Sequence, residues 1–301
     1  MRNVATKADR TMDTAPRPRL HLVRHHSDFG RWEVASRDPD PRLREWVLGY
    51  LGVDSRIHFF RERHMPSGEI ILIVNFGPPL WDLDRSSGGR TAEHRAGFIV
   101  GLQDRYALTE STGASHLVFV RFTPIGARRF FGLPNDCLTN RAVALDDVIA
   151  PARARVLVGR LAEASGWDSR FALLESFVAE RLADAPPVSE VVAWAWHRLH
   201  ESGGEIEVGR LAEELACSRK HLIARFREEV GLPPKLLGRI LRFQRVLRAI
   251  EREPRPRWVD VAIDCGYFDQ AHLIREFREF SGSTPTDFLE RFLPDGGGIL
   301  G

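Results

Sequence analysis

Two short stretches near the end of the chain, 51 residues apart, carry side chains rich in hydrogen-bond donors. Arg219 and Lys220 lie in the first stretch, and Gln270 and Arg275 lie in the second. Arg and Lys can donate hydrogen bonds to O6 and N7 of guanine, and Gln can bond N6 and N7 of adenine. These residue types could therefore read the edges of bases, provided that the chain presents them on exposed surfaces.

The two stretches belong to an internal repeat. When residues 218–234 are aligned with residues 269–285, eight of the 17 pairs are identical. Such self-similarity indicates that one structural unit occurs twice. The identical pairs are His221/His272, Leu222/Leu273, Ile223/Ile274, Phe226/Phe277, Arg227/Arg278, Glu228/Glu279, Gly231/Gly282 and Pro234/Pro285.

The pattern of each copy predicts a short helix, a tight turn and a longer helix. We expect the short helices at residues 208–215 and 259–264, and Ser218 and Asp269 as the N-caps of the longer ones. Leu222 and Phe226 are four residues apart and so face inward, and Gly231 ends the helix. This is the layout of a helix-turn-helix, whose second helix enters the major groove.

The layout assigns residues of the two units and of the helix between them to two predicted sets. The base-facing set lies on the first turns of the second helices and consists of Arg219, Lys220, Ile223, Gln270, Ala271, Ile274 and Arg275. The phosphate-contacting set consists of Ser218, Arg227, Arg239, Arg242, Arg245 and Arg278.

A single long helix is predicted between the two units, at residues 234–253. Twenty helical residues span about 30 Å, at 1.5 Å each. One turn of DNA measures about 34 Å, so such a helix could hold two recognition helices in successive major grooves.

Residues 188–292 resemble the DNA-binding domain of the AraC/XylS family of transcriptional regulators. The resemblance implies sequence-specific binding of double-stranded DNA and control of transcription. It rests on residues 259–280 and Gly282–Pro285 in the second unit, and on Leu211-Ala212, Ser218, His221-Leu222, Phe226 and Gly231-Leu-Pro in the first. The N-terminal part is similar to the sensor-type domain of one subgroup, through Trp46 to Tyr50, residues 64–71, residues 75–78 and residues 121–126.

The hydrophobic patterns predict an α+β protein. A small antiparallel β-barrel or cupin-like domain is expected first, with strands at 57–63, 69–76, 97–102 and 116–122, and a short helix after Pro41. Helices at 153–164 and 168–183, the second capped by Asp168, form a connector. The expected parts are a disordered tail (1–20), a sensor or dimerisation domain (21–150), the helical connector (151–185), the all-α tandem helix-turn-helix domain (188–293, with units 208–231 and 259–282) and a flexible tail (294–301).

Composition excludes several classes of protein. The 301 residues have a net charge of only +2 and no apolar run long enough to cross a membrane. Three cysteines are too few for a disulfide framework or a four-cysteine zinc site, which favours a cytoplasmic protein without a metal. We find no catalytic motif and expect no catalytic residues and no cofactor.

Our hypothesis is a transcriptional regulator, acting as an activator through RNA polymerase and controlled by a small-molecule effector or by homodimer formation. His64, Glu69 and Arg121 are hypothesised to line the effector cavity. Two alternatives stay open at this point. One is an enzyme or DNA-repair protein that uses the tandem motif for targeting, and the other is a ligand-free architectural DNA binder.

Overall fold

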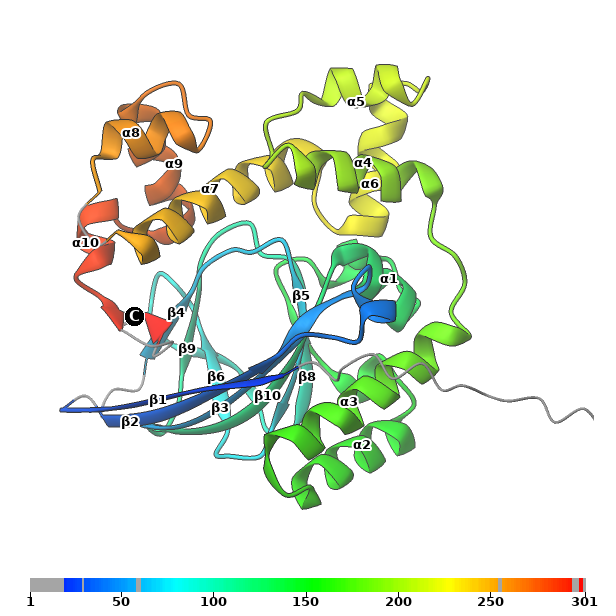
Figure 1. The fold of residues 1–301 in the computed structure, drawn as a ribbon, viewed down its shortest axis with the longest axis vertical. Coiled ribbons are helices and arrows are strands. Elements are labelled where there is room, and N and C mark those ends of the chain that lie inside the picture. Colours follow the sequence, from blue (N-terminus) through cyan, green and yellow to red (C-terminus); the bar gives the residue numbers. More distant parts are fainter. Residues whose placement is uncertain (1–18, 29, 58–60, 254–255, 294–297, 300–301) are drawn as a thin grey trace, which may run out of the picture.

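The computed structural model describes residues 19–28, 30–57, 61–253, 256–293 and 298–299. Two β-sheets with flanking helices form the first half of the chain, and the second half is mainly helical (Figure 1). Helix α7 (Pro234–Arg252) crosses above the sheets, between two smaller groups of helices. This arrangement confirms the expected α+β class, with a β-rich part before an all-helical part.

Seven strands form the larger antiparallel sheet, in the order β1-β2-β3-β10-β5-β8-β11. In β10, Val118, Val120 and Phe122 are fully buried on one face, as the alternating pattern of this segment predicts. The strands are β1 (Leu20–Ser27), β2 (Gly30–Arg37), β3 (Val47–Ile57), β5 (Ile70–Asn75), β8 (Gly97–Val100), β10 (Ala114–Phe122) and β11 (Ala142–Ala144).

A second antiparallel sheet has the order β4-β9-β6-β7. The strands are β4 (Arg61–His64), β6 (Leu80–Leu83), β7 (Arg90–His94) and β9 (Ala107–Glu110). Within the described residues the two sheets are not joined by strand pairing, so the cupin-like domain is open and is not a closed barrel.

The connector packs on the large sheet. Helix α3 (Gly166–Ala183) covers its outer face, where the ring of Phe171 lies 6.0 Å from that of Tyr50 in β3. Ser165 is the N-cap of α3 and Asp168 lies in its first turn, so the predicted cap at Asp168 was wrong by three residues. The other helices of this half are α1 (Pro124–Phe131), α2 (Pro151–Glu163) and the short 3₁₀ turns Pro41–Leu43, Asn135–Leu138 and Leu145–Asp147.

The helix predicted after Pro41 is only one 3₁₀ turn, Pro41–Leu43. From Val47 the chain is strand β3, which pairs with β2 on one side and β10 on the other. The apolar residues at helical spacing misled the prediction because two long-range ladders of hydrogen bonds outweigh local propensity here.

Some predicted boundaries also change. The strand expected at 57–63 is two strands, with β3 ending at Ile57 and β4 starting at Arg61; residues 58–60 lie outside the described part. Residues 1–18 of the expected N-terminal tail also lie outside it. In the expected C-terminal tail, Gly298–Ile299 (β13) pairs with Phe292–Leu293 (β12), and the other residues after 293 are not described.

The helical half contains both predicted helix-turn-helix units. Leu222, Phe226, Phe243, Leu273 and Phe277 fill its core and are almost fully buried. The helices are α4 (Glu190–Glu201), α5 (Val208–Glu214), α6 (Arg219–Val230), α7, α8 (Trp258–Asp264), α9 (Gln270–Ser281) and α10 (Pro285–Leu289). Across the described residues, the helices are all too short or too polar to span a membrane.

Candidate nucleic-acid interface

Both recognition helices, α6 and α9, begin with the predicted caps. Ser218 Oγ accepts a hydrogen bond from the backbone N–H of His221 at 3.2 Å. In the second unit, Asp269 Oδ1 accepts one from the N–H of His272 at 2.6 Å. These bonds satisfy amide groups that the first turn of a helix leaves without a partner, and they fix the start of each recognition helix.

Removal of the second cap should destabilise this unit measurably. We expect Asp269→Ala to lower the free energy of unfolding by about 1 kcal/mol, because the N–H of His272 loses its acceptor. Thermal melting of the purified protein measures the effect. Asp269→Asn is the matched control, since Asn caps about as well as Asp; equal melting of the Ala and Asn variants would contradict a capping role.

The structure presents the predicted base-facing residues in two groups, one at the start of each recognition helix. Arg219, Lys220, Ala271 and Arg275 are exposed. Ile223 is 39% exposed, and Gln270 and Ile274 are partly exposed. Each helix therefore carries donors and apolar groups together on its first turns, and both kinds of group are used in direct readout of bases.

The opposite ends of both helices are attached to the N-terminal half. At the end of α6, Asn135 Nδ2 donates to the carbonyl of Glu229 at 2.6 Å, and Thr139 Oγ1 donates to that of Gly231 at 2.7 Å. At the end of α9, the backbone N–H of Tyr106 donates to the carbonyl of Phe280 at 2.8 Å. Backbone carbonyls at the last turn of a helix lack intrahelical donors, so these bonds satisfy them.

Arg63 adds a second anchor at the end of α9. Its guanidinium donates to the carbonyl of Ser281 at 2.7 Å, and it lies 4.7 Å from the centre of the Tyr106 ring.

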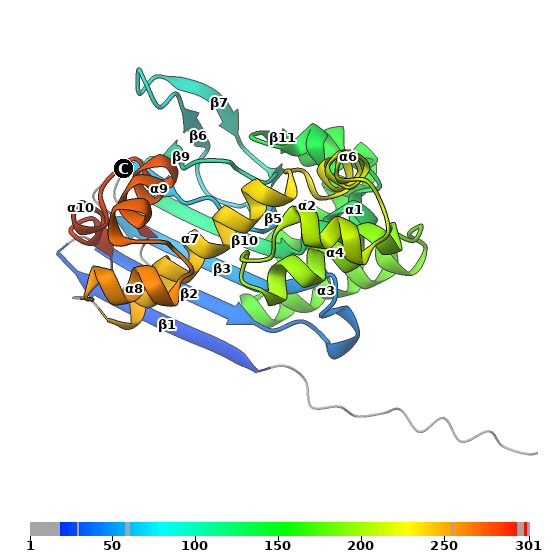
Figure 2. The ribbon, with the colours of Figure 1, turned by 90° about the horizontal axis from the view of Figure 1, so that it is seen from above.

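Seen from above, α6 is viewed nearly end-on, so it stands upright on the N-terminal half (Figure 2). The attached ends face the sheets, and the first turns of both recognition helices consequently lie on the outer side of the molecule (Figure 1).

Three of the predicted phosphate contacts have partners inside the helical half. Arg239 donates to the carboxylates of Glu276, at 2.7 Å, and Glu279. Arg242 donates to the carbonyl of Gly204 at 2.9 Å. Arg245 bonds Glu205 and the carbonyl of Asp264. These three arginines thus tie α7 to α8 and α9 of the second unit and to the connection between α4 and α5, which precedes the first unit.

Glu276 is the centre of this network. Its side chain is only 4% exposed, and the guanidinium of Arg242 lies 3.8 Å from it in addition to Arg239. Burial raises the pKa of the neighbouring Tyr267 hydroxyl, and the negative charge of Glu276 raises it further. Tyr267 therefore stays protonated, and the negative charge of Glu276 is matched by Arg239 and Arg242.

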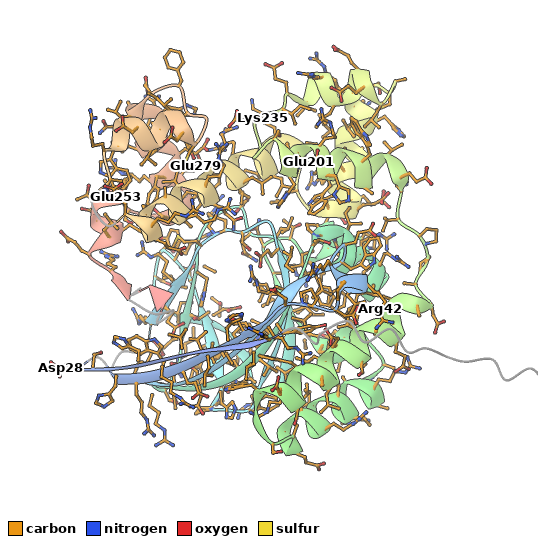
Figure 3. The ribbon with its side chains drawn as sticks, in the orientation of Figure 1. Asp28, Arg42, Glu201, Lys235, Glu253 and Glu279 are labelled. Carbon is orange, nitrogen blue, oxygen red and sulfur yellow. The ribbon has the colours of Figure 1, made fainter. Side chains whose placement is uncertain are left out.

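The other predicted phosphate residues are on the surface. Ser218, Arg227 and Arg278 are exposed. Lys235, which our phosphate set did not include, is also exposed and lies between the two units at the start of α7 (Figure 3). The sequence could have indicated Lys235, because this basic residue follows shortly after Gly231, where the first recognition helix is predicted to end.

A cavity of about 670 Å³ lies between the two sheets. The large sheet contributes apolar side chains, among them Val53, Ile73 and Phe119. The β8–β9 connection, which includes Tyr106, forms part of the wall. The same segment therefore lines the cavity and holds the end of α9.

Polar groups lie at defined points of this cavity. His64 and Glu69 line it, as hypothesised, whereas Arg121 is behind Glu69 and donates two hydrogen bonds to its carboxylate, at 2.6 and 2.7 Å. His94 bonds the carboxylate of Asp82 at 2.9 Å. Within the described ranges, no three His, Cys, Asp or Glu side chains converge as metal ligands.

Comparison with known families identifies both halves of the chain. The profile described as "Helix-turn-helix domain", which is of the AraC type, matches residues 211–291. The profile described as "Domain of unknown function (DUF6597)" matches residues 36–144. The chain is a DNA-binding transcriptional regulator with an AraC-type domain. The matches do not favour the alternative of an enzyme or an architectural protein.

Several solved structures match the chain, among them the following three. ToxT from Vibrio cholerae is 10% identical to this AraC-type regulator, with a TM-score of 0.47, covering 80% of this chain and 98% of ToxT. The C-terminal domain of AraT, a response regulator from Geobacillus stearothermophilus, is 18% identical (TM-score 0.33; 37% and 93% covered). A DNA-binding transcriptional dual regulator from Escherichia coli K-12 is 29% identical (TM-score 0.30; 34% and 92% covered). No curated protein sequence matches the chain.

Proposed function

We propose that this AraC-type regulator places the first turns of α6 and α9 in successive major grooves, and that a small molecule in the N-terminal cavity controls the binding. One observation supports the proposal most directly. Both recognition helices are fixed at their C-terminal ends to the N-terminal half and expose their first turns on the outer side. The two binding elements and the cavity are consequently parts of one connected framework.

The dimensions of α7 fit simultaneous binding. Its 19 residues span about 28 Å, close to the roughly 34 Å of one DNA turn. We propose direct contact with bases for the exposed groups on both first turns. These residues are Arg219, Lys220, Ile223, Gln270, Ala271, Ile274 and Arg275.

Phosphate attraction is proposed for the exposed groups around these turns, namely Ser218, Arg227, Arg278 and Lys235. Our predicted phosphate set also contains Arg239, Arg242 and Arg245, and for these three we propose a different role. Because their guanidiniums bond Glu276, Gly204 and Glu205, we propose that they set the spacing of the two units on the DNA.

The cavity is proposed to hold the effector. Its volume of about 670 Å³ lies within the roughly 300–1,000 Å³ of small-molecule sites, and its apolar wall with a few polar groups is typical of them. A ligand that contacts Tyr106 would favour one position of the β8–β9 connection. Since Tyr106 also holds the carbonyl of Phe280, that preference would reach α9 and shift the population able to bind both grooves.

A screen of metabolites by thermal melting tests this proposal. A ligand present at 100 times its dissociation constant adds about 2.7 kcal/mol of stability, which raises the melting temperature by several degrees. Filling the cavity with Val53→Trp and Ile73→Trp together should remove the rise and the effect of that ligand on DNA affinity. Leu22→Trp, on the edge strand β1, is the matched control. A ligand that stabilises the filled variant as strongly would place its site elsewhere.

Two protein partners are also proposed. We propose that a second copy of the chain docks at the α2–α3 pair, where exposed Val156 lies beside a groove of about 360 Å³. RNA polymerase is the proposed partner for activation. Sedimentation of the wild type and of Val156→Asp measures the association of two copies of the chain.

A further inference from the structure

The turns of the two helix-turn-helix units differ in length by one residue. Three residues separate the end of α5 from the cap Ser218, and four separate the end of α8 from the cap Asp269. The start of both turns is the same: the N–H of Cys217 donates to the carbonyl of Ala212, at 3.0 Å, and that of Tyr267 to the carbonyl of Ala262, at 2.9 Å. Phe268, directly before the second cap, is therefore an insertion with no counterpart in the first unit.

The side chain of Phe268 is 90% exposed. Its backbone is nevertheless held, because its N–H donates to Nδ1 of His272 at 3.4 Å, and the ring of His272 packs edge-on against Tyr267 with 5.2 Å between centres. The cap bond from His272 to Asp269 fixes the same turn. A phenyl group is thus displayed in water by an ordered turn, although burial of such a group is favourable.

The position of Phe268 indicates what covers this ring. Gln270, the first residue of α9, follows two positions later, and Ala271 and Arg275 are exposed on the first two turns of this helix. In a docked helix-turn-helix this end of the recognition helix meets the base edges. A hydrocarbon ring can make no hydrogen bond there, and its complement in the major groove is the methyl group of thymine.

We propose that Phe268 contacts a thymine C5-methyl group in the half-site read by α9, and so contributes to the choice of DNA sequence. The proposal rests on the docking of α9 in a major groove. The first unit has no such residue, so the requirement for thymine is confined to one half of the site. A protein partner is the competing occupant, because Ile263 on α8 is also 66% exposed.

The test uses the full chain and a DNA site selected from genomic fragments by the wild type. Each thymine of the site is replaced in turn by deoxyuridine, which removes only the methyl group. For the wild type we expect about a fourfold loss of affinity at one position in the α9 half, from about 0.8 kcal/mol per buried carbon. In Phe268→Ala the same replacement should change nothing, and the variant itself should bind the unmodified site several-fold more weakly. Phe268→Leu should restore part of the affinity and of the response to deoxyuridine.

Ile263→Ala is the matched control, an exposed apolar residue on the other helix of the unit, and it should bind and respond as the wild type does. The proposal is wrong if Phe268→Ala binds the selected site as tightly as the wild type does. It is also wrong if deoxyuridine lowers the affinity of both proteins equally. If Phe268→Ala and Ile263→Ala both keep their DNA affinity but lose transcription with purified RNA polymerase, a protein covers the ring and the proposal is wrong. If α9 does not dock in a major groove at all, the variants of Gln270 and Arg275 will keep the sequence preference of the wild type, which distinguishes this failure from that of the Phe268 proposal.

Discussion

Replacement of Gln270 and Arg275 together by alanine should remove most of the preference of the regulator for its own DNA site. Both side chains lie at the exposed start of α9, where Gln can bond adenine and Arg can bond guanine. Each good bidentate contact contributes about 1–3 kcal/mol of discrimination, so the pair accounts for roughly a hundredfold or more in affinity. Fluorescence anisotropy on the selected site and on unrelated DNA, at one fixed salt concentration, measures the change.

The loss on unrelated DNA should be much smaller, because only one positive charge is removed. Arg24→Ala, on strand β1 at the far side of the molecule, is the control for that charge and should leave both affinities unchanged. Equal losses on the selected site and on unrelated DNA would assign the two residues to phosphate contacts and remove them from the reading of bases.

The sequence was sufficient to predict the DNA-binding units because their determinants are local. Ser218 and Asp269 cap helices within three residues of their own position, and Gly231 and Gly282 end them with φ angles of 108° and 75°. Because the unit occurs twice in the chain, the second copy provided a check on the interpretation of the first. Most errors in the fold have the opposite origin: β3 looked helical from residue spacing alone, and its identity as a strand depends on β2 and β10.

The parts of the site that escaped sequence analysis depend on contacts between distant residues. Asn135 and Arg63 bond backbone carbonyls 94 and 218 residues away, and a carbonyl has no side-chain identity that a sequence can reveal. Arg239, Arg242 and Arg245 had the spacing of an exposed basic face. Their partners, Glu276 and Glu205 among them, lie in other helices or loops, so only the tertiary structure shows that these charges are neutralised.

The second large effect is expected from Glu276→Ala. The carboxylate is 4% exposed and accepts a hydrogen bond from Arg239 at 2.7 Å, with Arg242 at 3.8 Å. Without Glu276, Arg239 keeps the exposed Glu279 and Arg242 keeps the carbonyl of Gly204, so two partly buried charges lose their buried partner, which costs up to about 3 kcal/mol. We expect a large fall in the melting temperature and weaker binding to the selected site, since α9 loses its buried ion pair with α7.

Glu279 provides a matched control, because it bonds the same guanidinium from a position that is 57% exposed (Figure 3). An exposed ion pair contributes at most about 1 kcal/mol, so Glu279→Ala should melt close to the wild type. Glu276→Gln keeps the shape and one acceptor and should fall between the two. If Glu276→Ala and Glu279→Ala were equally stable, the buried network would not hold the second unit on α7, and the fixed spacing of the two recognition helices would need another cause.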